Sequence, residues 1–553
     1  MKKRYKILIA LVLLIAIAFA YLFSVSRMQE PVHPEISLEN FSVNVVNDSL
    51  ITCGDSWLKQ NKFGIWELFV QGDSYSMGLK NGVLTKDLLQ YQEKVFVEQI
   101  NELVPSKFYL QFLRLFLGWF NRKMLDYVPE EYQLEIAGVS KSASGEFNFI
   151  APPFQRIMSY HGAHDMGHAL QSLTLVGCTS FGVWNGFSAD SSLLIGRNFD
   201  FYAGDRFSEN KIIAFVKPDE GYPFMSVTWG GMIGVVSGMN AEGLTITLNA
   251  EPTNIPHISK TPVSILARKI LQYASTIDEA YKIAQENEIF VSESFLIGSG
   301  KENRVALIEK TNTQTTLYKP EIDRITVTNH FINSSLIQPD KEKTGFKDAS
   351  HYRMELVNAL IDSIDVFSVE EVAGVLRDRN GKNGENIGFG NEKAVNQLIA
   401  HHGIIFKPQE KKVWVSAAPF QLGTFVAYDL DEIFASPDSF ATKTAYLSNE
   451  NIASDKFLLS EDYEQFLQYK NTLAAIQDKI KSKSAITDIE FDELIALNKN
   501  YYYPWFLAGN FYYEKRKFEP ALSYFSKAIK LEIPQESTYN EIQELIENCR
   551  KNL

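Results

Sequence analysis

Cysteine is scarce in this chain of 553 residues, which has only Cys53, Cys178 and Cys549. A fold held together by several disulfides is therefore excluded, because such folds need many closely spaced cysteines. Positive charge is also in short supply, since 54 Lys and Arg residues face 67 Asp and Glu residues, which gives a net charge of −13. An acidic chain lacks the basic surface that binds phosphate backbones, so we expect no nucleic-acid partner.

Apolar material is abundant by comparison. Hydrophobic residues make up 45% of the chain, aromatic residues 13% and charged residues 22%. This composition excludes a mainly disordered protein and provides for a large core. At about 150 residues per domain, the length allows three to four domains, or one large domain with an appendage.

The N-terminus combines a basic start with an uncharged apolar run from Ile7 to Phe23. This pattern predicts export, through a signal peptide cut after Ala18-Phe19-Ala20 or an uncleaved signal anchor within 1–26. The anchor is favoured, because the run continues past that site toward membrane-spanning length. The basic residues favour the cytoplasmic side, so we expect a membrane-anchored or secreted body outside the cytoplasm, on the periplasmic side in a bacterium.

Three patterns follow the export segment. Residues 27–177 show helical periodicity, and residues 178–440 contain short β-rich runs separated by Gly and Asn turns and by helices. Strands mixed with helices, without strict alternation, predict an α+β fold with largely antiparallel sheets. Residues 455–553 are again helical throughout. Within the first region, Phe108–Phe120 is strongly apolar, for which burial between helices is the favoured interpretation and contact with lipid the alternative.

The helical tail contains one sequence that resembles a tetratricopeptide repeat. The matching pattern is Trp505-x-x-Ala508-Gly509-x-x-Tyr512, then Ala521-x-x-x-Phe525, then Ala528 and Pro534. A single repeat cannot bury its own apolar face. It must therefore pack on the flanking helices or on a protein partner.

A cysteine preceded by glycine opens the β-rich region, and further motifs follow it in order. Gly177-Cys178-Thr-Ser is followed by Gly196-Arg-Asn-Phe-Asp200. An isolated cysteine is more often an inert buried thiol, so a catalytic role for Cys178 is indicated only by the motifs taken together. The other members are Gly72–Gly78, Gly238–Asn249, Thr326–His330 and Ser350-His-Tyr-Arg353.

In this order the motifs resemble the N-terminal nucleophile (Ntn) hydrolases, closest to the penicillin acyltransferase (isopenicillin-N acyltransferase-like) family, with choloylglycine hydrolases as more distant relatives. The resemblance covers about residues 65 to 432. It implies a four-layer αββα sandwich, with a helical prosegment before it, and self-cleavage between Gly177 and Cys178. The cut would free an α-amino group beside the thiol. Since that group has an ordinary pKa of about 7.7–8.0, nucleophile and base would share one residue.

The resemblance also implies roles for five further residues and no cofactor or metal. Arg197 is expected to stabilise the thiolate and orient the substrate, and Asp200 to hold the new amine. Asn249 and Asn329 are expected to donate to the oxyanion, and Arg353 to organise this network. The plain structural alternatives are an ion pair at a strand end for Arg197 and Asp200, and turn positions for the two asparagines.

Three histidines in the helical region form a rival candidate site. His161-x-x-His164-x-x-x-His168 has the spacing that could place three nitrogens on one face of a helix around a metal. However, Asp165 stands where a metalloprotease would carry the glutamate of its motif. A polar helix without metal is therefore favoured, and a metal hydrolase is the second enzymatic alternative.

The sequence thus predicts a self-processing amidohydrolase or acyltransferase that attacks a small N-acyl amide through an acyl-thioester on Cys178. Hydrolysis is the expected outcome outside the cytoplasm, where acyl-CoA is scarce. The apolar segment 108–120 favours a lipid-like acyl group only weakly. The alternative from a different class is a non-catalytic scaffold that presents the tail, residues 455–553, to a protein partner.

Overall fold

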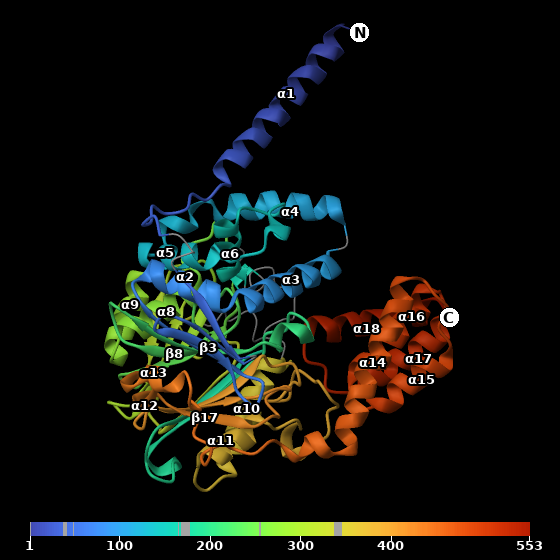
Figure 1. Cartoon of the computed structure of the whole chain (residues 1–553). Coiled ribbons are helices and arrows are strands. Elements are labelled where there is room, and N and C mark those ends of the chain that lie inside the picture. The colour runs from blue at the N-terminus through green and yellow to red at the C-terminus, as the bar shows by residue number, and fades with distance from the viewer. Residues whose placement is uncertain are drawn as a thin grey trace.

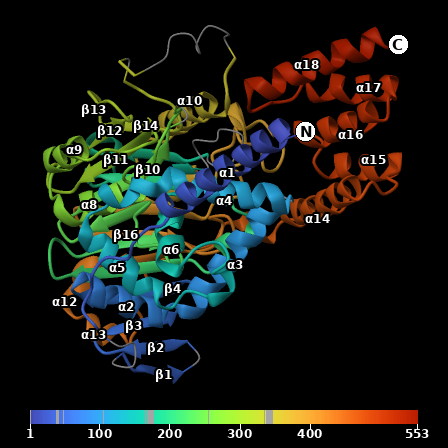
Figure 2. The ribbon, with the colours of Figure 1, turned by 90° about the horizontal axis from the view of Figure 1, so that it is seen from above.

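The computed structural model of the chain describes residues 2–36, 41–47, 49–104, 106–163, 165–166, 177–253, 256–333, 335–336 and 346–553. It has three parts (Figures 1 and 2). A single helix, α1 (Lys2–Val25), points away from a central α/β body, and a group of helices lies at the C-terminal end.

Helix α1 contains the apolar run that predicted an export segment. Just after it, Gln155 Nε2 donates a hydrogen bond to the Ser26 carbonyl at 2.7 Å, which ties the helix to the body. Among the residues that the structure describes, no helix has the length and apolarity needed to cross a membrane. The signal anchor and the cellular location stay predictions.

Two sheets form the centre of the body. The first has 11 strands in the order β1-β2-β3-β4-β7-β8-β9-β10-β11-β12-β13, and the second has six in the order β14-β5-β6-β15-β16-β17. Neighbouring strands are antiparallel except for the parallel pair β4 and β7. The strands of the first sheet are β1 (Val43–Asn47), β2 (Leu50–Cys53), β3 (Ser56–Gln60), β4 (Trp66–Gly72), β7 (Ile212–Pro218), β8 (Phe224–Thr228), β9 (Ser237–Asn240), β10 (Leu244–Ala250), β11 (Glu293–Ser299), β12 (Arg304–Lys310) and β13 (Thr315–Tyr318). Those of the second are β5 (Thr179–Val183), β6 (Leu194–Phe199), β14 (Arg324–Val327), β15 (His402–Lys407), β16 (Lys412–Ser416) and β17 (Phe425–Asp429).

The two sheets pack face to face. Phe215 and Met239 of the first sheet share a buried apolar cluster with Ile195, Phe406 and Val415 of the second. Helices cover both outer faces, so the layers run helix, sheet, sheet, helix. Contacts with the first sheet come from α2 (Ser74–Leu84), α8 (Val263–Tyr273) and α9 (Ile277–Glu286), and contacts with the second from α10 (Ala349–Asp362) and α11 (Val369–Leu376). The predicted αββα sandwich is confirmed.

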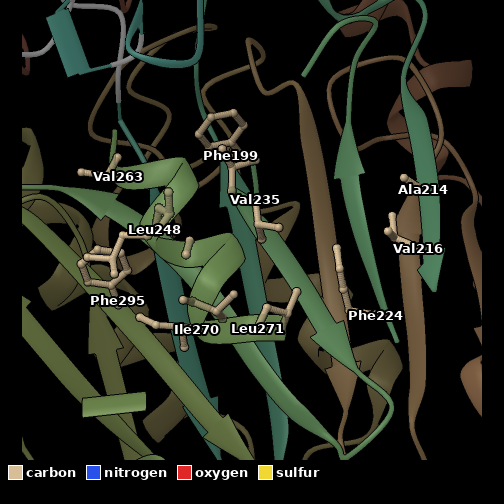
Figure 3. Close-up of a cluster of buried hydrophobic side chains, with 14 of the residues drawn as sticks. Phe199, Ala214, Val216, Phe224, Val235, Leu248, Val263, Ile270, Leu271 and Phe295 are labelled. Atoms are coloured by element: carbon tan, nitrogen blue, oxygen red, sulfur yellow. The ribbon is translucent and has the colours of Figure 1, made fainter. Parts of the chain in front are cut away.

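Alternating apolar side chains bind each helical layer to its sheet. On the outer face of the first sheet, Leu248 and Phe295 lie against Ile270 and Leu271 of α8 (Figure 3). A second layer of helices follows, because α5 (Glu130–Ser140) packs on α2. Glycine permits this contact, since a Cβ on Gly78 would lie 2.1 Å from the Glu135 carbonyl oxygen.

The remaining helices of the body are α3 (Lys86–Leu103), α4 (Lys107–Phe120), α6 (Pro153–His161), α12 (Leu430–Ala435) and α13 (Pro437–Phe440). Helix α4 corrects one expectation. Phe120 is buried, but Tyr109, Phe112 and Phe116 are 50%, 58% and 42% exposed. The apolar segment is therefore not simply buried between helices, because its residues occupy more than the one face that packs on the body.

The C-terminal part is entirely helical, as predicted. It consists of α14 (Glu461–Lys481), α15 (Asp488–Leu497), α16 (Tyr502–Glu514), α17 (Phe518–Ala528) and α18 (Glu536–Lys551). Helices α16 and α17 pack closely because Gly509 leaves room for the Phe525 ring, which a Cβ would approach to 2.5 Å. Leu398 and Leu422 of the body share the apolar cluster of this tail. The tail thus buries its face on its own helices and on the body, while its assignment to the tetratricopeptide class stays a prediction.

Candidate active site

The structure brings the six predicted catalytic residues together at one end of the sandwich. Cys178 directly precedes β5, and the neighbouring strand β6 contains Arg197 and ends next to Asp200. Asn249 lies in β10 of the facing sheet, while Asn329 follows β14 and Arg353 lies in α10. All except the half-buried Asn329 are buried. The arrangement follows from the topology, because β14, β5 and β6 are adjacent strands.

Cys178 faces a buried cation. Its Sγ lies 3.5 Å from Nη2 of Arg197, and the guanidinium is fixed by donation from Nη1 to the Val236 carbonyl at 2.9 Å and by contacts with Ser237 and Leu248. Burial raises the pKa of the Cys178 thiol to about 11, against the opposing effect of Arg197. In the intact chain the thiol is therefore protonated near neutral pH.

The backbone of Asp200 contacts both residues of the Gly177–Cys178 bond. Its carbonyl accepts from the Gly177 N–H at 2.9 Å, and its own N–H donates to the Cys178 sulfur. Its carboxylate is fully buried, yet neither oxygen has a hydrogen-bond partner among the described residues. Burial raises the pKa of Asp200 to about 7, although the guanidinium groups of Arg353 and Arg197 act in the opposite direction.

The two asparagines bridge the ends of β10 and β14. Asn249 Oδ1 accepts from Ser180 Oγ at 2.8 Å, and its Nδ2 donates to the Thr328 carbonyl at 3.0 Å. Asn329 Nδ2 donates to the Ala250 carbonyl at 3.0 Å. In the intact chain both side-chain amides therefore donate to backbone carbonyls, and these donors would have to turn to reach an oxyanion.

Arg353 connects three separate segments of the site. Its Nε donates to Thr179 Oγ1 at 3.2 Å, beside the nucleophile, and its Nη2 donates to Asn329 Oδ1 at 2.8 Å. Its Nη1 donates to the Glu392 carbonyl at 2.6 Å. These contacts agree with the organising role that the resemblance implies for Arg353.

The sequence did not reveal a further group that lies at the Gly177–Cys178 bond. Gln397 Nε2 donates to the Gly177 carbonyl oxygen at 2.7 Å, and Gln397 is 2% exposed. The glutamine lies 220 residues further along the chain, in a loop without a recognisable motif, so no signal in the sequence could have found it.

Two buried glutamates were also missed. Neither carboxylate oxygen of Glu293 has a hydrogen-bond partner among the described residues, and Glu251 Oε1 accepts from Ser294 Oγ at 2.6 Å. Burial raises the pKa of both carboxyls well above the ordinary value. Burial therefore disfavours a negative charge on either carboxyl beside the thiol.

The rival metal site finds no support in the part of the histidine cluster that the structure describes. His161 Nε2 accepts from the Ile233 N–H at 3.0 Å, so its Nδ1 carries the proton that it shares with the Ile157 carbonyl at 2.8 Å. Burial lowers the pKa of His161 to about 4. Both nitrogens are engaged within the protein, while His164 and His168 lie outside the described residues. The described residues contain no group of three or more potential metal ligands.

An apolar pocket adjoins the site. It lies next to the catalytic residues, since Phe201 follows Asp200 and the Val236 carbonyl binds Arg197. Its one acidic side chain, Glu93, is paired with Arg156 at 2.7 Å. The pocket therefore suits an apolar group. Its other lining residues come from both sides of the Gly177–Cys178 bond and include Leu89, Phe96, Ile157, Tyr160, Phe207, Trp229 and Met232.

A family model matches part of the chain. Residues 187–420 match the model of the family described as acyl-coenzyme A:6-aminopenicillanic acid acyl-transferase. This match begins after Cys178, so the nucleophile itself depends on the geometry. An uncharacterized protein of Archaeoglobus fulgidus is 26% identical over 258 residues, which are 43% of this chain and 42% of the relative. The chain thus spans less than half the length of that relative.

Two solved structures show distant likeness. An N-acylethanolamine-hydrolyzing acid amidase ortholog of Caenorhabditis elegans is 16% identical with a TM-score of 0.32, over 42% of this chain and 93% of that chain. A mutant conjugated bile acid hydrolase of Clostridium perfringens is 12% identical with a TM-score of 0.32, over 46% and 93%. Scores this low carry no argument. The resemblance therefore depends on residues 187–420, which match the model of the acyl-coenzyme A:6-aminopenicillanic acid acyl-transferase family, and on the sandwich seen in the structure.

Proposed function

We propose that this protein is a self-processing amidohydrolase or acyltransferase whose nucleophile is the N-terminal cysteine created by cleavage between Gly177 and Cys178. One observation carries the proposal. The fully buried Asp200 carboxylate, without a hydrogen-bond partner among the described residues, belongs to the residue whose backbone binds both Gly177 and the Cys178 sulfur. The new ammonium group on Cys178 would supply the positively charged hydrogen-bond donor that this carboxylate lacks.

The mature reaction needs only groups that converge here. The α-amino group takes the thiol proton, and Arg197 Nη2, 3.5 Å from the sulfur, stabilises the thiolate. The sulfur attacks the amide carbonyl and forms a C–S bond. The C–N bond then breaks, and the leaving amine takes the proton. Water completes hydrolysis of the acyl-thioester, or a second amine completes acyl transfer.

The pocket indicates the substrate class. An acyl group lying in it would place its carbonyl toward the site, because Phe201 and Val236 connect the pocket to Asp200 and Arg197. The apolar walls favour a small amide with an aliphatic or aromatic acyl group, since burial gains about 25 cal/mol per Å² of apolar surface. We propose hydrolysis as the ordinary outcome, in a protein exported from the cytoplasm.

The decisive test is the mass of the purified protein. Two associated fragments, the second beginning at Cys178, support the proposal, and Cys178→Ala should remain a single chain of 62.8 kDa. Activity is then measured on a panel of N-acyl amides. An intact wild-type chain that hydrolyses these amides would contradict the assigned nucleophile. A cut protein inactive on the whole panel, captured by a partner through residues 455–553, would favour the scaffold alternative.

A further inference from the structure

We propose that Gln397 is the oxyanion donor of the self-cleavage step, and that the C-terminal helices position it through the loop that precedes β15. This inference rests on the proposed function, because it concerns how the Gly177–Cys178 bond is cut. It assigns a role to two features that the motifs left without one: a buried glutamine and the helical tail.

The geometry places the glutamine at the reacting atom. Gln397 Nε2 donates to the Gly177 carbonyl oxygen at 2.7 Å, and the N–H of Gly177 donates to the Asp200 carbonyl at 2.9 Å. The N–H and the carbonyl of Gly177 are therefore both held by hydrogen bonds. A Cβ on residue 177 would lie 2.7 Å from Nε2 of Gln397. A larger residue at this position would therefore displace the Gln397 amide from the carbonyl oxygen.

The step gives this donor a defined task. The Cys178 sulfur, after losing its proton, forms a bond to the Gly177 carbonyl carbon, and the carbonyl electron pair moves to the oxygen held by Gln397. A donor already placed at that oxygen stabilises the developing charge at no cost of reorganisation. The C–N bond then breaks, and the nitrogen takes the former thiol proton. Water hydrolyses the thioester, which returns the thiol and leaves Gly177 as a carboxylic acid.

The C-terminal helices hold the residue next to the donor. Leu398 has a φ of 55°, in the left-handed region that leucine rarely adopts. Such a backbone persists only where its surroundings over-determine it. Leu398 is 1% exposed and shares the apolar cluster of the tail with Phe457 and Phe466.

Polar contacts fix the rest of the same loop. Asn498 of the tail pairs twice with the backbone of Phe389, since its Oδ1 accepts from the N–H and its Nδ2 donates to the carbonyl, each at 2.9 Å. Tyr501 donates to Glu392 Oε2 at 3.2 Å. The Glu392 carbonyl in turn binds Arg353. Figures 1 and 2 show the tail beside the body. Because Asn498 and Tyr501 bind this loop, they act as positioning residues through it.

The first experiment follows self-cleavage of the full chain after a labelling pulse in cell-free translation, with intact chain and fragments separated by mass. Gln397→Ala should slow cleavage by about 100-fold, the usual loss for one oxyanion donor. Gln421→Ala is the matched control, because Gln421 is equally buried and its side chain has no hydrogen-bond partner among the described residues. It should cleave at the wild-type rate. Equal rates for Gln397→Ala and wild type would overturn the proposal.

A second variant separates chemistry from folding. Gln397→Glu keeps the size of the side chain, but it can donate a hydrogen bond only while its carboxyl is protonated. The cleavage rate of Gln397→Glu relative to wild type should therefore rise as the pH falls. A ratio that does not change with pH would contradict the donor role even if Gln397→Ala fails to fold.

The tail is tested in the same assay. The double variant Asn498→Ala/Tyr501→Phe removes the contacts with the loop, whereas Lys479→Ala/Tyr512→Phe removes contacts of Lys479 with Glu490 and of Tyr512 with Asp488 inside the tail. We expect cleavage about 10-fold slower in the first and unchanged in the second, at equal thermal midpoints. Equal rates would refute the positioning role. An intact wild-type chain would refute the proposed function instead, so the two failures are distinguishable.

Discussion

The protonation of Asp200 provides a quantitative test of the site. In the intact chain, burial raises its pKa from 3.8 to about 7. In the unfolded chain the carboxyl loses its proton near pH 4, so between about pH 4 and pH 7 the folded chain binds the additional proton. The stability that this group contributes is therefore complete at low pH and is lost as the pH rises through about 7. Three pKa units at 1.36 kcal/mol each give a loss of about 4 kcal/mol.

The measurement compares Cys178→Ala, which lacks the thiol that the proposed cleavage needs, with the double variant Cys178→Ala/Asp200→Asn. Urea unfolding followed by tryptophan fluorescence gives the free energy of unfolding at a series of pH values. The difference between the two proteins should change by about 4 kcal/mol from pH 4 to pH 8, while contributions from Glu293 and other buried carboxyls cancel. Parallel curves would show that Asp200 has an ordinary pKa, and would refute the burial argument.

Four further predictions concern neighbouring residues. Arg197→Gln removes the cation 3.5 Å from the thiol, so alkylation of Cys178 by a small reagent should need a higher pH than in wild type. Asn249→Ala should lower kcat by about 10²–10³, with KM much less affected, in assays of the processed enzyme. Trp229→Ala enlarges the pocket, so kcat/KM should shift toward larger acyl groups across a substrate series. Gly78→Ala should lower the free energy of unfolding by about 1–3 kcal/mol and the thermal midpoint with it, because its Cβ would lie 2.1 Å from a backbone carbonyl oxygen.

The motifs predicted much of the fold because they mark its strand ends. Arg197 and Asp200 lie at the end of β6, and Asn249 lies near the end of β10. An ordered set of short motifs therefore identified strands of both sheets. Alternation also worked for β10, where Leu248 faces α8 and Asn249 faces the second sheet. The sequence could thus predict which residues converge.

The rest depends on contacts between distant segments that have no local pattern. Gln397 reaches Gly177 across 220 residues. The buried oxygens of Glu293, which have no hydrogen-bond partner in the described part of the chain, come to light only once the strands are assembled. The same holds for helix α4, because periodicity showed an apolar segment but not that Phe112 would stay 58% exposed. Local composition cannot tell whether a neighbour will cover such a face.

The parallel pairing of β4 with β7 would affect the lifetime of a processed protein. Strand β4 precedes the Gly177–Cys178 bond and β7 follows it, and they pair over seven residues from Trp66 with Ile212 to Gly72 with Pro218. Cutting the bond therefore leaves one sheet made of two chains. Unfolding would then release two molecules, and regaining the fold would become a second-order reaction that slows on dilution. The cut that creates the nucleophile would thus make loss of structure nearly irreversible, and the working life of the enzyme would depend on how slowly it unfolds.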